Sequence, residues 1–394
     1  MASIIEKRRQ TPVIEEADVV VVGGGSAGFP AAIAAARLGA RTVLIEKWGY
    51  AGGAAVGGLV LTVPPKAGIW GVEKEMYDRL RARGAIHEDP PNKEYYETIV
   101  SAPECKILGD AMLQEAGVVI LYHSLFVGVA AKDGRIDAVI IENKSGRQAV
   151  RAKVVIDTTG DGDVAARAGV PFTLGNAEGK MLEATTMYLA SDVNAEQYLK
   201  YRVPTKDLPG PVSGLAFTKL HRGEINCWGG KVEGDATDVR ELTRMEIALR
   251  AQIRTEWDNM RRYHKGFETA YITCLAEQMG MRETRHVHAD YMVTQADEKA
   301  KTRFPDSIGV CWEFTVPYRA LCAQTCSNLL LGGRCIGAES AAIGPLRIVP
   351  NCCTTGQAAG AAAALAAAKK GDVRAVEIGK LQETLKGQGV ELGV

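Results

Sequence analysis

The sequence has no Cys-x-x-Cys pair, few histidines and no long uncharged run of apolar residues. Its nine cysteines are an odd number scattered over 394 residues, which indicates reduced thiols and not a disulfide framework. Their spacing matches no metal-ligand pattern. The alanine-rich run 358–368 is shorter than the ~18 residues of a membrane span and is followed by Lys369 and Lys370. We therefore expect no metal centre, no disulfide and no membrane segment.

An excess of either charge is also missing, because 47 Lys and Arg residues balance 47 Asp and Glu residues. Without a basic field, the chain is not expected to bind nucleic acid or an anionic membrane. A small neutral or acidic metabolite is the expected partner. Residues 1–16 contain Lys7, Arg8 and Arg9 but no apolar core before a cleavage site, so we expect a leader arm and not a secretion signal. A cytoplasmic location follows.

A glycine-rich turn between two apolar strands is the most informative feature present. Val19–Val22 form a continuous apolar run, and the glycines within 23–28 let the backbone turn toward a pyrophosphate at the next helix. Glu46, 18 residues past Gly28, can accept a hydrogen bond from a ribose 2′-hydroxyl and would repel a 2′-phosphate. The pattern predicts a βαβ unit for FAD or NAD and not for NADP.

Two more segments with the pattern of buried strands lie far along the chain, at 154–156 and 329–331. Antiparallel hairpins are expected over 118–156, with a turn at Lys132, Asp133 and Gly134. Helices are expected over 72–83, 239–263 and 354–370. In the first of these helices, the apolar side chains share one face and the charges occupy the other; the apolar set is Val72, Met76, Tyr77 and Leu80.

We predict an α/β fold with a Rossmann-like, glutathione-reductase-type FAD-binding domain and an inserted α+β substrate domain. The FAD-binding domain comprises 17–171 and 281–394, and the substrate domain comprises 172–280, where proline-containing loops and a charged helix replace glycine-punctuated strands. The sequence lacks a second glycine-rich dinucleotide motif, so no separate NAD(P)H site is predicted. Three segments that lie far apart in the chain are expected to form one sheet. Because a simple NAD dehydrogenase needs only the first βαβ unit, this arrangement favours FAD over NAD as the cofactor.

Several motifs together resemble a known family. They are GGGSAG with Glu46, Gly52-Gly53, 159–163 (TGDGD), 280–285 (GMRETR), 317–321 (PYRAL), 332–334 (GGR) and 356–360 (GQAAG). From about residue 17 to 370, the chain is similar to the FAD-dependent oxidoreductases related to fumarate reductase and succinate dehydrogenase flavoproteins. The resemblance implies FAD more firmly than it implies a substrate.

The resemblance also implies the parts of FAD that each segment contacts. Glycines of the first turn would face the pyrophosphate, Glu46 the adenosine ribose, and the backbone of Val127 the adenine edge. Arg334 stands where relatives carry an acid at the ribityl chain. The implied cofactor residues are Gly23, Gly25, Ser26, Ala27, Gly28, Glu46, Lys47, Gly52, Gly53, Val127, Gly160, Asp161, Gly333, Arg334, Gly356, Gln357 and Ala358.

Two departures from related flavoproteins bear on the chemistry. The first cysteine is Cys105, so the CxxxxC dithiol of disulfide reductases is missing and disulfide reduction is not expected. The loop 52–58 contains no histidine, so FAD is expected to be held without a covalent bond.

The candidate catalytic residues are Arg347, His286, Arg282 and Tyr318. Arg347 precedes a helix predicted to begin near Thr354, whose amides would stabilise negative charge on the flavin, and an arginine can also hold a substrate carboxylate. His286 and His288 alternate on a predicted strand, and either an acid–base role or structural packing fits them. Cys352 and Cys353 precede that helix, where small size or a lowered thiol pKa would explain them.

The sequence thus predicts an FAD-dependent oxidoreductase that moves a hydride between a small organic substrate and flavin N5. One alternative is a flavin-binding electron-transfer subunit of a larger complex. Another is an NAD-dependent dehydrogenase that uses only the first βαβ unit. The sequence leaves open a homo-oligomer or a partner subunit.

Overall fold

A mainly parallel sheet forms the centre of the computed structural model, which describes residues 4, 9–64, 68–88, 98–218, 220–221 and 223–394. Its parallel part has the order β6, β2, β1, β9, β18. These strands are β6 (Val119–Leu121), β2 (Thr42–Ile45), β1 (Val13–Val22), β9 (Gly146–Asp157) and β18 (Leu329–Leu331). The three distant strands expected from the sequence therefore lie side by side. Because β1 begins at Val13, the last four residues of the predicted leader arm belong to this sheet.

The long strand β9 joins this parallel part to an antiparallel extension. Its first half pairs with β8 (Arg135–Asn143), which pairs with β7 (Leu125–Lys132). Its last three residues pair with β18. Asp133 and Gly134, at φ 51° and 69°, make the two-residue turn between β7 and β8, a conformation that Asp-Gly favours. The predicted hairpins are confirmed for β7, β8 and β9, whereas the first segment of the predicted hairpin region forms β6, which pairs in parallel with β2.

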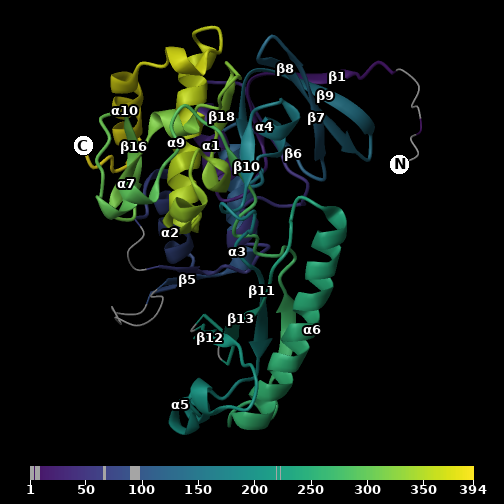
Figure 1. Ribbon diagram of the computed structural model, residues 1–394. Coiled ribbons are helices and arrows are strands. Elements are labelled where there is room, and N and C mark those ends of the chain that lie inside the picture. The colour runs from purple at the N-terminus through teal and green to yellow at the C-terminus, as the bar shows by residue number, and fades with distance from the viewer. Residues whose placement is uncertain (1–3, 5–8, 65–67, 89–97, 219, 222) are drawn as a thin grey trace.

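Helices α1 (Gly28–Arg37) and α9 (Val349–Ala367) pack against each other beside the sheet (Figure 1). A Cβ atom on Gly356 would stand 2.0 Å from the Ala27 carbonyl oxygen, and one on Gly360 would stand 2.1 Å from that of Ala31. Only glycine permits this approach. The predicted start of the second helix near Thr354 is wrong: the helix begins five residues earlier, because Pro350 fits the first helical turn.

A small antiparallel sheet adjoins two helices that pack against α1. Its strands are β3 (Thr62–Val63), β5 (Thr98–Val100) and β4 (Ile86–Glu88), and the helices are α2 (Gly71–Ala82) and α3 (Ala102–Glu115). Elsewhere in this body lie α4 (Asp163–Arg167), β10 (Phe172–Leu174) paired with β15 (Arg285–Val287), α7 (Gln295–Lys299), the β16 (Ser307–Cys311) and β17 (Phe314–Pro317) hairpin, α8 (Ile343–Leu346) and α10 (Ile378–Gly387).

A second, four-stranded antiparallel sheet lies at the far end of the molecule from β7 and β8 (Figure 1). Its order is β12 (Gly214–Phe217), β13 (Ile225–Val232), β11 (Ala184–Ser191), β14 (Tyr271–Leu275). Helix α6 (Val239–Tyr263) matches the predicted helix and packs on this sheet through Ile253, Trp257 and Met260. The short helix α5 (Ala195–Tyr201) also belongs here. This region has its own hydrophobic cluster and falls within the span predicted for the inserted domain.

In the part of the chain that the structure describes, no helix has the length and apolar character needed to cross a lipid bilayer.

Candidate cofactor and substrate site

The turn between β1 and α1 is as tight as the glycine pattern predicts. Gly23 has φ 96°, and a Cβ on Gly28 would stand 1.7 Å from the Gly23 carbonyl oxygen. The Thr158 hydroxyl at the end of β9 donates to the same carbonyl at 2.7 Å. A Cβ on Gly25, by contrast, would meet nothing nearer than 3.9 Å, so a ligand can approach the start of α1 there.

Glu46 lies directly behind this turn. It is 7% exposed, and its two carboxylate oxygens accept hydrogen bonds from the backbone N–H groups of Gly24 (2.6 Å) and Trp48 (2.9 Å). Burial raises the pKa of Glu46, and these N–H groups oppose the rise. The carboxylate is therefore held in one orientation at the end of β2, as a ribose contact requires.

The loop that carries Gly52 and Gly53 closes over the same turn. The Gly52 N–H donates to the Gly24 carbonyl at 2.8 Å, and both glycines have positive φ, at 107° and 52°. A Cβ on Gly53 would stand 2.7 Å from the Cα of Gly25. We call residues 23–28 together with Gly52 and Gly53 the dinucleotide cradle.

Val127 and Lys47 are two further residues that the resemblance assigns to the cofactor. Val127 is the extra residue of a β-bulge between Phe126 and Gly128, which takes it out of the regular ladder. The neighbouring segment contacts the cradle, because the Ser124 N–H donates to the Glu46 carbonyl at 3.0 Å. Lys47 is exposed. A bulged backbone beside Glu46 suits the predicted contact with an adenine edge.

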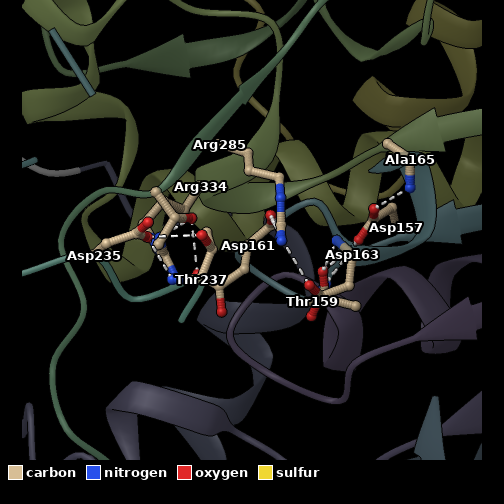
Figure 2. Close-up of polar contacts among 10 residues, drawn as sticks. Asp157, Thr159, Asp161, Asp163, Ala165, Asp235, Thr237, Arg285 and Arg334 are labelled. Carbon is tan, nitrogen blue, oxygen red and sulfur yellow. Dashed lines mark hydrogen bonds and ion pairs between the residues drawn. The ribbon is translucent and has the colours of Figure 1, made fainter. Parts of the chain in front are cut away.

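Arg334, which stands where relatives carry an acid, pairs with side chains of the protein itself. Its guanidinium pairs with Asp161 at 2.7 Å and donates to the Thr284 hydroxyl at 3.1 Å (Figure 2). Arg285 donates to the Asp161 carbonyl (2.8 Å) and pairs with Asp163 (2.9 Å). Burial alone would raise the pKa of Asp161, but the Arg334 charge and hydrogen bonds hold it below its usual value. This cluster fastens the turn after β9 to the segment 284–285, next to Gly160.

Of the predicted cofactor residues near the start of α9, Gly333 lies against the glycine-rich turn, whereas the side chains of Gln357 and Ala358 contact other parts of the protein. Gly333 has φ 76°, its N–H donates to the Thr355 hydroxyl at 3.0 Å, and a Cβ there would stand 2.8 Å from that of Ala27. Gln357 was predicted to bind cofactor, but its amide accepts from the Val72 N–H (2.9 Å) and donates to Gln388 (3.0 Å). Its side chain instead fastens α9 to the start of α2 and to the residue that follows α10, and the fully buried Ala358 packs in the core.

Two of the predicted catalytic arginines come together without a protein partner. Arg282 forms no hydrogen bond or ion pair with any described residue, and the buried Nε of Arg347 has none either. Burial, and then the neighbouring charges of Arg282 and Arg334, lower the pKa of Arg347. The negative charge of Glu283 raises the pKa of Arg347, but the Glu283 carboxylate is hydrogen-bonded to His286 and to the Leu182 N–H. Arg347 stands two residues before α9, so its charge adds to the positive end of that helix.

His286 and Tyr318, two other predicted catalytic residues, are both buried and hydrogen-bonded within the protein. His286 is 3% exposed, and its Nε2 lies 2.7 Å from Glu283, whose other oxygen accepts from the Leu182 N–H at 2.7 Å. The Tyr318 hydroxyl is buried and donates to the Val373 carbonyl at 2.7 Å. His288 falls outside β15, so the two histidines do not share a strand.

Cys352 and Cys353 lie inside the first turns of α9 and not before it. Burial raises the pKa of both thiols, to about 12 for Cys352. They are small buried side chains at a packed helix end, which confirms the packing interpretation over the reactive one.

Sequence reasoning missed Glu73. The helical pattern placed it on the charged face of α2, but it is 4% exposed, and neither carboxylate oxygen has a hydrogen-bond partner among the described residues. Burial raises its pKa to about 8. An acid in the first turn of a helix is common, so its presence in the sequence does not indicate that it is buried. The burial of Glu73 comes from α3 and α9, which lie elsewhere in the chain.

The residues of the cradle fit a flavin dinucleotide. A sharp turn opens onto the start of α1, an oriented acid stands at the end of β2, and two glycines leave the loop above without side chains. The second long helix begins beside the same turn and presents unpaired cationic groups. These features accept a pyrophosphate at one end and a polar, electron-accepting ring at the other.

Comparison with known proteins agrees with this geometry. A sequence model of the family described as FAD dependent oxidoreductase matches residues 18–313 and 310–385. Two curated relatives match only locally: dihydrolipoyl dehydrogenase from Trypanosoma brucei brucei, 48% identical over 60 residues, and leghemoglobin reductase from Glycine max, 51% identical over 53 residues. These matches cover 15% and 14% of this chain but only 12% and 10% of the lengths of those relatives.

Solved structures share the fold over almost the whole chain. A geranylgeranyl bacteriochlorophyll reductase-like protein from Thermoplasma acidophilum is 18% identical, with 95% of this chain and 84% of that chain covered at a TM-score of 0.54. The flavin-dependent brominase Bmp2 is 12% identical, with 94% and 83% covered at a TM-score of 0.51. At these identities the likeness concerns the fold alone.

Proposed function

Since the chain belongs to the family of FAD-dependent oxidoreductases, we propose that it moves a hydride between a small organic anion and N5 of non-covalently held FAD. Bound flavin supplies the hydride chemistry and, when reduced, carries negative charge near N1 and the C2 carbonyl. The family match favours FAD over the NAD-dependent alternative. The protein's own part is to hold the dinucleotide in the cradle, orient the substrate and exclude water.

The observation that carries this proposal is the unpaired arginine pair at the start of α9. An uncompensated guanidinium in a partly buried position is costly unless a ligand completes its hydrogen bonds. Arg347 lacks a partner at Nε, and Arg282 lacks one altogether among the described residues. A carboxylate can accept two parallel hydrogen bonds from one guanidinium, which fixes its orientation as well as its position. We propose that the substrate carries such a group.

The test is anaerobic reduction of the flavin-loaded protein by hydroxy acids, amino acids and their uncharged esters. We expect acids to bleach the flavin and esters to do so at least about tenfold less efficiently, the loss of one charge-assisted hydrogen bond. Arg347→Gln and Arg282→Gln should abolish that preference. Arg319→Gln is the matched control, because Arg319 is half exposed and pairs with Asp306 on the surface. Equal bleaching by acids and esters in the wild type would contradict the proposal.

We also propose the subfamily, the fold subtype, the domain boundaries and the cellular location of the protein. The motifs at 280–285 and 317–321 support a relation to fumarate reductase flavoproteins, and the mixed parallel and antiparallel sheet supports the glutathione-reductase type. The four-stranded sheet supports 172–280 as the inserted substrate domain. The free thiols of all nine cysteines support a cytoplasmic location. A homo-oligomer, or an electron-transfer partner, would show as a stable complex in size-exclusion chromatography.

A further inference from the structure

A cavity next to the cradle contains the unpartnered acid Glu73. The space free of protein atoms in this cavity, which is partly open to solvent, totals about 620 Å³. Ser26 and Gly52 of the cradle line one end, and Val349 and Cys353 in the first turns of α9 line another. The cavity therefore connects the two places between which a dinucleotide would extend.

Glu73 is the one acid that lines this cavity. Most of the other lining residues are apolar, including Phe29, Val56 and Met76. The Tyr77 hydroxyl and the Cys353 thiol approach the carboxyl, but neither makes a hydrogen bond of good geometry with its oxygens, so the carboxyl lacks the close partners that buried polar groups normally have. A polar ligand group in the cavity would remove this cost.

The groups that surround Glu73 leave it uncharged at neutral pH. The Tyr77 hydroxyl on its own helix and the Cys353 thiol on α9 act as weak hydrogen-bonding groups that lower its pKa, and Cys352 lies within electrostatic range, but no cation among the described residues does. Burial thus dominates and raises the pKa of Glu73 to about 8. Burial also raises the pKa of the Cys105 thiol, on α3, to about 12. A neutral carboxyl can donate one hydrogen bond and accept others, and it does not repel a nearby pyrophosphate.

The order of groups along FAD identifies what would lie at the cavity. The pyrophosphate belongs at the start of α1, beside Ser26, and the isoalloxazine ring belongs near the start of α9. The ribityl chain, with its hydroxyl groups, connects the two. Arg334, which the sequence placed at this chain, is committed to Asp161 and Thr284. The ribityl hydroxyls therefore need another polar partner.

We propose that Glu73 is that partner and hydrogen-bonds the ribityl hydroxyls of FAD from the wall of this cavity. The inference rests on FAD as the cofactor and on the placement of its ring near α9, but not on the identity of the substrate. It adds a cofactor contact from α2, a helix for which the sequence pattern predicts no functional role.

Equilibrium binding of FAD, followed by flavin fluorescence, tests the proposal without turnover. The ligands are FAD and an FAD analogue in which a hydroxyl-free alkyl linker replaces the ribityl chain. The proteins are the wild type, Glu73→Leu, Glu73→Gln and the control Asp78→Asn, an exposed acid on the same helix. We expect Glu73→Leu to weaken FAD binding about tenfold, the size of one lost hydrogen bond, and to leave the analogue's affinity unchanged. Glu73→Gln and Asp78→Asn should stay within about threefold of the wild type.

A pH series supplies the second readout. Wild-type affinity for FAD should fall as the pH rises from 7 to 9.5, because an ionised Glu73 loses its donor and repels the pyrophosphate, whereas Glu73→Gln should show no such fall. If Glu73→Leu weakens FAD and the analogue equally, Glu73 only shapes the cavity and the proposal is wrong. Unchanged FAD affinity in Glu73→Leu would overturn it too. The hydride-transfer proposal survives either result, because it depends on Arg282 and Arg347.

Discussion

Two groups of arginines near the cradle differ in one respect that separates structure from function. Arg334 and Arg285 bind Asp161 and Asp163, so every charge in that cluster is compensated within the chain. Arg282 and Arg347 lie close by and lack such partners. The acids show the same contrast, since Glu46 accepts two backbone hydrogen bonds and Glu73 accepts none from described residues. In the arginine cluster, compensation fastens segments of the fold together, whereas the uncompensated groups are the ones that we propose to bind a ligand.

The largest effect is expected at Glu73. The folded protein keeps the Glu73 proton up to a pH of about 8, whereas the unfolded chain loses it near the ordinary value of 4.5. The free energy of unfolding should therefore decrease as the pH rises from 4.5 to about 8 and then level off. At about 1.4 kcal/mol per pKa unit, Glu73→Gln should gain a few kcal/mol over the wild type across this window. Urea unfolding of the FAD-free proteins at several pH values measures the difference, and a constant difference would contradict the buried, neutral acid.

The compensated cluster should respond next most strongly. Arg334→Ala leaves Asp161 without its cation and should lower the free energy of unfolding by about 3 kcal/mol. Asp161→Ala should cost a similar amount, and the double variant little more than either single change, because the two residues act as a pair. Urea unfolding of the three variants checks this. Additive losses would show that the ion pair does not couple the turn after β9 to 284–285.

The uncompensated pair should behave in the opposite way. Arg347→Gln removes a partly buried charge with no partner, so the free energy of unfolding should stay the same or rise by about 1 kcal/mol. Thermal unfolding in the absence of FAD and substrate measures this change. A loss of more than about 1 kcal/mol would mean that Arg347 has a structural partner in the folded protein and would weaken its assignment to a ligand.

The surface provides the smallest expected effect. Arg319 belongs to a motif shared with the family, but its guanidinium is half exposed and pairs with Asp306 at 2.9 Å. Arg319→Gln should change the free energy of unfolding by about 0.5 kcal/mol or less and leave flavin reduction unchanged. A large loss of flavin reduction would show that Arg319 has a functional role even though its charge is paired with Asp306.

The sequence predicted what local pattern and sheet periodicity determine. The parallel strands at 19–22, 154–156 and 329–331, the hairpin turn at Asp133 and the helix 239–263 all occur as expected. These features depend on apolar periodicity and turn chemistry within a few residues, and so they can be read without a tertiary structure.

The contacts that the sequence did not predict involve partners that lie far away in the chain. Gln357 is held by Val72 and Gln388, Tyr318 by Val373, and Glu73 is buried by helices from other parts of the sequence. Helix α9 begins earlier than predicted because Pro350 fits the first turn of a helix, where its missing N–H costs no hydrogen bond. No pattern around any one of these residues reveals its partner.

The central claim is that an anion site formed by Arg282 and Arg347 adjoins the flavin. The most direct measurement is the visible difference spectrum of the flavin-loaded protein titrated with a simple carboxylate such as benzoate. We predict a saturable perturbation of the flavin bands in the wild type that disappears when both arginines are replaced by glutamine. The same perturbation in the doubly substituted protein would contradict the account.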